Sequence, residues 1–418
     1  MAALGVLRAL YLLTDSFWVG RLGPAPLAAI GGASFGWWII VLTCELPAIG
    51  AHSRVARQVG ARRLDAVPHT LASAAVVGVA LAALLAALSP AAGLYFDLLG
   101  FARGSAELAH GRDYLAACML GAASLALSAV VGAAFRGLGD TRTALALTAA
   151  SLVLNAALDP ALIWGVGVVP ALGVAGAAWA TAISNLVGAI AGAALLARRG
   201  VAVTRGRPTA ALALELSRIG APISGSGAGF ALVYVLLASL ISRFGPEHIA
   251  GLGVGHRLEG LAYLVCVAFG VAAATMVGQH LGAGDAARAR ASARAAARLA
   301  LAAMIPCTLV LFAGAAPLFS LFTDDAATVD AGARYLRIQT AVLVLMALEE
   351  VYKGAFTGAA RTLGVSIVSF GLTAVRWPAA WLLAVGLGMG IDGVWIAIAA
   401  STAVKGALLA LLWRRAPL

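Results

Sequence analysis

The sequence predicts an all-α integral membrane protein of about twelve transmembrane helices, and three observations lead to this prediction. First, 62% of the 418 residues are apolar and only 11% are charged, whereas soluble domains are roughly 45–50% apolar and about 25% charged. Second, apolar runs of about 20 residues, long enough to span a bilayer as a helix, recur along the whole chain. Third, the connections between the runs are alternately basic and neutral or acidic. Together these features exclude a soluble globular enzyme and a disordered chain.

Charged residues interrupt the apolar runs and so mark the ends of the candidate spans. Each run is far longer than the roughly ten-residue alternating strands of a membrane β-barrel, so helices are predicted. Small residues are frequent in them, with 49 glycines in the chain, and small residues allow transmembrane helices to pack closely. The candidate spans are residues 1–20, 27–51, 67–94, 108–135, 142–166, 171–197, 216–243, 247–275, 288–321, 328–358, 361–386 and 391–413.

The basic connections predict how the chain is oriented. Lysine and arginine are retained on the cytoplasmic side of membrane proteins, so we expect a multi-pass protein of the cell (inner or plasma) membrane with both termini in the cytoplasm. The net charge of +11 arises from these separate islands and not from one basic face, so no nucleic-acid partner is predicted. The residues concerned are Arg54, Arg57, Arg62, Arg63, Arg136, Arg142, Arg198, Arg199, Arg205, Arg207, Arg288, Arg290, Arg294, Arg298, Arg361, Arg414 and Arg415.

The chain also repeats itself with a shift of about 222 residues. Arg21-Leu22-Gly23-Pro24 recurs as Arg243-Phe244-Gly245-Pro246, and other short segments keep nearly the same register. We therefore predict an N-lobe of helices 1–6 at residues 1–197, a cytoplasmic linker at 198–214 and a C-lobe of helices 7–12 at 215–418. The two six-helix lobes are expected to be related by a pseudo-two-fold axis along the membrane normal, a plan common among transporters that work by alternating access.

Polar side chains inside the spans are the candidates for function, because ionisable groups at membrane depth are costly. Asp15 lies in the first predicted span and Asp159 in the fifth. Asn155 precedes Asp159 by four residues and therefore shares its helical face. Thr181 in the sixth span carries a hydroxyl that can join the same network. These four residues are candidates for binding a proton or another cation.

Two structural interpretations compete with that assignment. Asp159-Pro160 can mark the end of a helix, since proline removes a backbone N–H and favours a bend. Asp15 can pair with Arg21 near the outer end of its span.

The second half carries its own ionisable residues, of which Glu259, Glu350 and Arg376 are candidates for coupling or substrate binding. Glu349 and Lys353 stand four residues apart, a spacing that permits an ion pair along one helix. Glu259 and Arg376 then need partners elsewhere, with each other and Glu350 as candidates.

Three further side chains are candidates for lining a substrate cavity, namely Glu45, Trp38 and Tyr234. Tryptophans near span ends are alternatively interfacial anchors.

No motif indicates an enzyme or a bound cofactor. The sequence has no Gly-x-x-x-x-Gly-Lys-[Ser/Thr] phosphate loop, no His-Glu-x-x-His and no Gly-x-Ser-x-Gly. The four cysteines lie in apolar runs without paired spacing, so no metal site is predicted.

Five segments resemble the multidrug and toxic compound extrusion (MATE) transporters, and the resemblance covers essentially the whole chain. They are Asp15 to Gly23, Ala28 to Gly31, Arg136 to Thr141, Leu154 to Pro160 and Gly173 to Thr181. The chain is most similar to the branch that includes the DNA-damage-inducible F-like proteins. Members of the family usually have a longer segment before the first acidic residue, so the first helix here is expected to be truncated or short.

The resemblance implies a secondary active exporter of multiple drugs or organic cations, which exchanges its substrate for H⁺ or Na⁺ by alternating access. It implies small cationic or amphipathic substrates, a monomer in the lipid bilayer and no cofactor besides the coupling ion. Asp15, Asn155, Asp159 and Thr181 match the cation-binding cluster of the family's N-lobe. An alternative within the superfamily is a flippase for lipid-linked precursors or lipids, and a more distant one is an intramembrane enzyme or a receptor.

Overall fold

The computed structural model describes residues 14, 15, 17–167 and 170–417, and almost all of their regular structure is helical. Residues 14, 15 and 17–20 are helical and belong to the first predicted span, 1–20, of which the remainder lies outside the described residues. The helices up to residue 198 are α2 (Pro24–Gly60), α3 (Val67–Leu88), α4 (Ala92–Leu98), α5 (Ala106–Leu120), α6 (Ala122–Gly137), α7 (Thr141–Trp164) and α8 (Val174–Arg198). Those that follow are α9 (Ala210–Ile241), α10 (Pro246–Gly282), α11 (Ala286–Ala313), α12 (Ala315–Ser320), α13 (Ala326–Gly358), α14 (Thr362–Ala374), α15 (Arg376–Trp381) and α16 (Ile391–Arg415).

The all-α membrane fold predicted from the sequence is confirmed. Within the described residues ten helical segments are long and apolar enough to cross a membrane, and α5 with α6 makes an eleventh if this pair, bent by 48°, is one span. Two predicted spans are shorter than the helices that contain them, because α2 and α10 each continue beyond the apolar run into the basic segment that follows. The charged end of a long helix can extend into water, where apolar residues are no longer required.

The described chain forms two compact units, one ending at Ser224 and the other beginning at Gly225. The division falls within α9, because the first turns of this helix pack on α2. A Cβ at Gly220 would lie 1.9 Å from the Leu46 carbonyl oxygen, and Glu215 forms an ion pair with Arg54. The predicted linker, residues 198–214, contains the short helical turn Val203–Arg205 and the start of α9.

Equivalent turns in the two units have the same backbone conformation. Gly23 and Gly245, each followed by a proline that begins a helix, have φ angles of 126° and 127°. Gly173 and Gly390, which precede α8 and α16, have φ angles of 56° and 62°. Left-handed backbone of this kind favours glycine. The internal repeat seen in the sequence is therefore also a repeat of backbone conformation.

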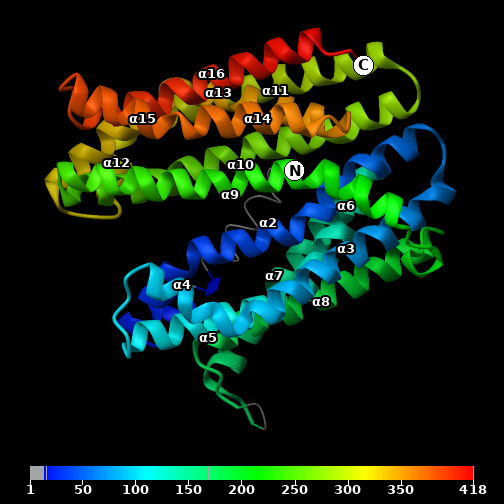
Figure 1. Cartoon of the computed structure of the whole chain (residues 1–418), viewed down its shortest axis with the longest axis horizontal. Helices are drawn as coiled ribbons and strands as arrows, with labels where there is room; N and C mark the ends of the chain where they lie inside the picture. The colour runs from blue at the N-terminus through cyan, green and yellow to red at the C-terminus, as the bar shows by residue number, and fades with distance from the viewer. Residues whose placement is uncertain (1–13, 16, 168–169, 418) are drawn as a thin grey trace. The chain divides into compact units, whose positions relative to one another are not determined.

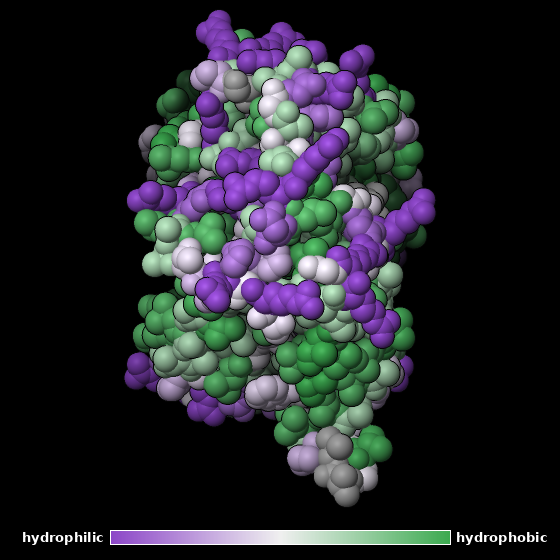
Figure 2. All heavy atoms as spheres, turned by 90° about the vertical axis from the view of Figure 1, so that its right-hand side faces the viewer, coloured by the Kyte–Doolittle hydropathy of each residue, from purple (hydrophilic) through white to green (hydrophobic). Residues whose placement is uncertain are grey.

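Each unit gathers its basic connections at one end of its helices. In the first unit these connections follow α2, α6 and α8, and in the second they follow α10 and α13 (Figure 1). Figure 2 shows the face of the molecule that is turned toward the right-hand side of Figure 1, and hydrophilic side chains are abundant on it. Asp140 caps α7 through the Thr143 backbone N–H at 3.0 Å, and Asp285 caps α11 in the same way at 2.8 Å. Capped, polar ends therefore flank apolar helices that are long enough to span a membrane.

Candidate functional site

Four polar side chains of the first unit meet in one buried cluster. Asn155 Nδ2 donates to Asp159 Oδ1 at 3.3 Å and to Thr181 Oγ1 at 3.2 Å. The Thr181 hydroxyl in turn donates to Asp15 Oδ2 at 3.4 Å. Asn155 and Asp159 are fully buried, while Asp15 and Thr181 are each 7% exposed. The structure thus brings together all four residues predicted from the first half of the sequence.

The positions of these side chains follow from helix geometry. Asn155 and Asp159 are one turn apart on α7 and point the same way, and α8 packs beside α7 and presents Thr181. Asp15 comes from the first helical segment. α7 continues through Pro160 to Trp164, so the interpretation that Asp159-Pro160 ends a helix is wrong.

The cluster has unused capacity to bind a cation. Asp15 Oδ1, Asn155 Oδ1 and Asp159 Oδ2 are buried and have no hydrogen-bond partner among the described residues. In the described part of the chain no lysine or arginine forms an ion pair with either aspartate. The Arg21 guanidinium lies instead over the rings of Phe17 and Trp18, 4.6 and 5.3 Å from their centroids. Two adjacent buried carboxyl groups without a basic partner favour uptake of a proton or another cation.

In the second unit, the ion pair that the spacing of Glu349 and Lys353 permits is not the one that forms. Glu349 pairs with Lys405 of α16, with 3.0 Å between Oε1 and Nζ, and Lys353 pairs with Glu350 one turn away on its own helix. Lys405 is not among the candidates predicted from the sequence, although a lysine within an apolar span is itself a signal of an intramembrane ion pair. Because α16 supplies the second cation, both glutamates are paired.

Glu259 and Arg376 also have partners other than those expected from the sequence. Glu259 Oε2 accepts a hydrogen bond from the Tyr335 hydroxyl at 3.1 Å, while its Oε1 has no partner among the described residues. Arg376, 3% exposed, donates to the hydroxyl oxygens of Ser401 at 2.6 Å, Thr402 at 2.8 Å and Tyr234 at 3.0 Å. Hydroxyl groups, which a search for charged partners overlooks, therefore fix both side chains.

The three residues predicted to line a substrate cavity differ in their surroundings. Trp38 and Glu45 lie on α2, and Trp38 is 42% exposed, as either a cavity residue or an interfacial anchor would be. Tyr234 belongs to the second unit, is buried, and packs its ring on Phe230 with centroids 4.5 Å apart. Its hydroxyl is occupied by Arg376.

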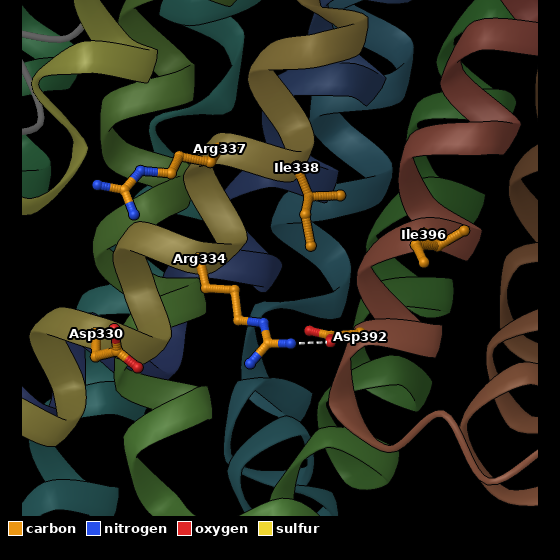
Figure 3. Close-up of a pocket in the computed structure, with 6 residues that line it drawn as sticks. All are labelled: Asp330, Arg334, Arg337, Ile338, Asp392 and Ile396. Atoms are coloured by element: carbon orange, nitrogen blue, oxygen red, sulfur yellow. Dashed lines mark hydrogen bonds and ion pairs between the residues drawn. The ribbon is translucent and has the colours of Figure 1, made fainter.

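The second unit has an open pocket of about 400 Å³ between α13 and α16 (Figure 3). Arg334 points across it to Asp392, with which it forms an ion pair. Arg337 lies further along α13 and its side chain points away from that pair. A much smaller cavity of about 40 Å³ lies between α6, α7 and α8. Among the described residues no group of three or more His, Cys, Asp or Glu side chains is arranged to hold a metal ion.

A repeated bundle of membrane-spanning helices that buries a cluster of carboxyl, amide and hydroxyl groups is typical of one class of protein, the multi-pass membrane transporters. The family model MatE matches residues 2–161 and 222–382, one match in each half. The chain belongs to the MATE family, whose members are transporters and not enzymes.

Individual relatives cover nearly the whole chain. The multidrug resistance protein NorM of Burkholderia vietnamiensis is 30% identical over 414 residues, which cover 96% of this chain and 88% of that protein. A probable NorM of Thermotoga maritima is 26% identical with the same coverage. A FAD transporter of Shewanella oneidensis is 28% identical over 75% of this chain and 70% of its own length.

Solved structures show the same fold. An outward-facing conformation of a multidrug resistance MATE family transporter superposes with a TM-score of 0.90 at 23% identity, covering 99% of this chain and 93% of that one.

Proposed function

We propose that the protein is a secondary active exporter of small organic compounds, cationic or amphipathic in character, that exchanges them for H⁺ or Na⁺ by alternating access. The NorM relatives, named for multidrug resistance, support the substrate class. The observation that carries the coupling is the cluster of Asp15, Asn155, Asp159 and Thr181, buried and without a basic partner in the described chain.

The proposed mechanism follows from the charge of that cluster. When it is empty, two carboxylates share a buried site and repel each other. A proton or Na⁺ removes the repulsion and lets the hydrogen bonds through Thr181 hold Asp15 to α7 and α8. Loading therefore changes how strongly the first helix is attached to its unit, and we propose that this difference biases the transporter between its two states.

The test is transport of a fluorescent organic cation in proteoliposomes, with proton and sodium gradients imposed separately. We expect one gradient to drive substrate movement, and Asp15→Asn and Asp159→Asn each to abolish the driven component. Asp113→Asn is the matched control, because Asp113 is an exposed residue that pairs with its neighbour Arg112. The proposal would be overturned if the transport rate depended on neither gradient, or if the gradient-driven rate were unchanged in both cluster variants.

Acidic aromatic cargo is a second candidate, supported by the relative named as a FAD transporter and by the buried Arg376. The guanidinium of Arg376 donates to three hydroxyl oxygens, lies over the rings of Phe230 and Tyr234, and forms no ion pair with a carboxylate among the described residues. Addition of FAD to the same vesicles tests it: competition with the organic cation indicates shared transport, and its absence excludes FAD.

The remaining proposals concern topology. We propose a monomer in the cell (inner or plasma) membrane with both termini in the cytoplasm, since the basic connections lie at one end of each unit's helices. Reporter fusions after Arg199 and after Phe322 should give opposite sidedness, and the same sidedness at both positions would contradict this topology.

A further inference from the structure

The small cavity between α6, α7 and α8 has a polar lining inside an otherwise apolar bundle. Ser128 of α6, Thr148 and Ser151 of α7 and Asn185 of α8 contribute its polar side chains. Its volume of about 40 Å³ exceeds the roughly 10–15 Å³ that one water molecule needs. Hydroxyl and amide groups both donate and accept hydrogen bonds, and they supply the partners that buried water requires.

The register of two helices connects this cavity to the carboxylate cluster. On α7, Thr148, Ser151, Asn155 and Asp159 follow one another at intervals of three or four residues and share one face. α8 runs the other way, since Asn155 contacts Thr181 while Ser151 lies against Gly188. A continuous polar face therefore leads from the cavity to the cluster.

Hydrogen bonds connect the wall of the cavity to the carboxylate cluster. Asn185, in the cavity wall, donates its amide to the Thr181 carbonyl oxygen at 2.9 Å, and the Thr181 side chain is bonded to both Asn155 and Asp15. At the other end, a Cβ at Gly132 would lie 3.0 Å from a guanidinium nitrogen of Arg136. The cavity thus approaches the charged connection between α6 and α7.

We propose that this cavity is a hydrated passage through which protons or small cations travel between the basic-loop side of the first unit and the Asp15–Asp159 cluster. The inference rests on the proposed function and adds a route to it, with Ser128, Thr148, Ser151 and Asn185 as positioning residues for water. In each proton step a hydronium O–H bond breaks as a carboxyl O–H bond forms, and nothing is oxidised or reduced. A cluster buried among apolar helices needs such a path, because hydrocarbon conducts no ions.

Gly188 offers a way to close the passage. A Cβ there would lie 2.2 Å from Ser151 Oγ and so intrude on the cavity. We expect Gly188→Ala to slow gradient-driven transport about tenfold or more, which corresponds to a barrier higher by at least ~1.4 kcal/mol. Gly31→Ala is the control, since no heavy atom lies within 4 Å of its Cβ position.

A second pair of variants separates closure from misfolding. Ser151→Ala removes the oxygen that the new methyl group would meet, whereas Ser151 Cβ lies at an ordinary 3.6 Å from it. The double variant Ser151→Ala with Gly188→Ala should therefore fold as stably as Ser151→Ala alone, yet transport more slowly because the methyl group still fills the cavity. Equal rates in these two stable proteins would overturn the proposal.

Hydration itself can be measured without any transport. In a background in which Cys44, Cys118, Cys266 and Cys307 are replaced by alanine, Thr148→Cys should react with Ag⁺, a thiol-reactive cation small enough for a water-sized passage, added on the basic-loop side. Ile190→Cys, on the 62% exposed surface of α8, should react at least about tenfold more slowly, because a thiol in lipid forms little thiolate. Equally slow labelling of both positions excludes the passage, whether or not the exporter proves to be ion-coupled.

Discussion

The Arg376 guanidinium donates a hydrogen bond to the Tyr234 hydroxyl at 3.0 Å and thereby joins α15 to α9. Its bonds to Ser401 and Thr402 join it to α16 as well. In the first unit the corresponding helices, namely the first helix, α7 and α8, are joined by the carboxylate cluster. The second repeat thus keeps a polar junction of three helices but places there a guanidinium, which only donates hydrogen bonds and offers no acceptor to a cation. Ion loading and unloading are consequently expected in the first unit and not at this junction.

The substitution Arg376→Lys should weaken the junction of α9, α15 and α16, although lysine also carries a positive charge. A single ammonium cannot reproduce the planar fork that reaches three hydroxyl oxygens. Hydrogen bonds between membrane helices contribute ~0.6 kcal/mol on average and up to ~1.7, so a loss of about 1–3 kcal/mol is expected as a lower unfolding temperature in detergent. Arg334→Lys, at an exposed ion pair, should change the unfolding temperature little. An Arg376→Lys protein as stable as the native one would show that the fork is dispensable.

The buried pair of Glu349 and Lys405 gives a second prediction. The two residues are 6% and 4% exposed, so Lys405→Met leaves an uncompensated carboxylate and should cost about 3–5 kcal/mol of stability. Adding Glu349→Leu should restore most of the loss, since an apolar pair can replace a buried ion pair. Thermal unfolding of both single variants and the double variant measures the coupling. A double variant less stable than Lys405→Met would contradict the argument.

Asp140 provides a pH-dependent prediction outside the membrane spans. The hydrogen bond from the Thr143 side chain, followed by that from its backbone N–H, lowers the pKa of Asp140 to about 2, and Arg199 contributes further. Because this pKa is below the ordinary value of about 3.9, the stabilisation is present above that value and is lost as the pH falls towards 2.

Asp140→Ala should therefore lower the unfolding temperature near neutral pH, by the ~1 kcal/mol typical of a lost helix cap. Its difference from the native protein should shrink between about pH 4 and pH 2. Asp140→Asn retains an acceptor for the Thr143 N–H but loses the ion pair with Arg199, seen at 2.6 Å, so an intermediate effect is expected. A difference that stays constant over this pH range would rule out the carboxylate as its source.

The sequence was sufficient to predict the helices and the shared face of Asn155 and Asp159, because both can be recognised within single segments of the chain. The grouping of Asp15 and Thr181 with them joins three helices, and it was implied by the resemblance to the MATE family. Asn155 and Asp159 share a face through their spacing alone. The partner of Glu349 was not predictable in this way, since it depends on which residue of α16 packs against α13, and Lys353 offered an equally spaced local alternative. Arg376 was recognisable as an intramembrane charge, but its hydroxyl partners lie on two other helices.

Glycines on α10 and α13 give the last prediction, in which one chemical change has opposite effects at two positions. A Cβ at Gly354 would lie 1.9 Å from the Gly270 carbonyl oxygen, so these helices touch through their backbones. Gly354→Ala must separate them and should destabilise the protein by the ~1–3 kcal/mol or more that overpacking costs. Gly253→Ala, on α10 with no heavy atom within 4 Å, should instead stabilise it by up to ~1 kcal/mol through helix propensity. Unfolding temperatures that move in the same direction for both variants would refute close backbone approach as the reason for Gly354. Opposite directions would establish that the packing of α10 against α13, and not helix propensity, determines which of these glycines the second unit requires.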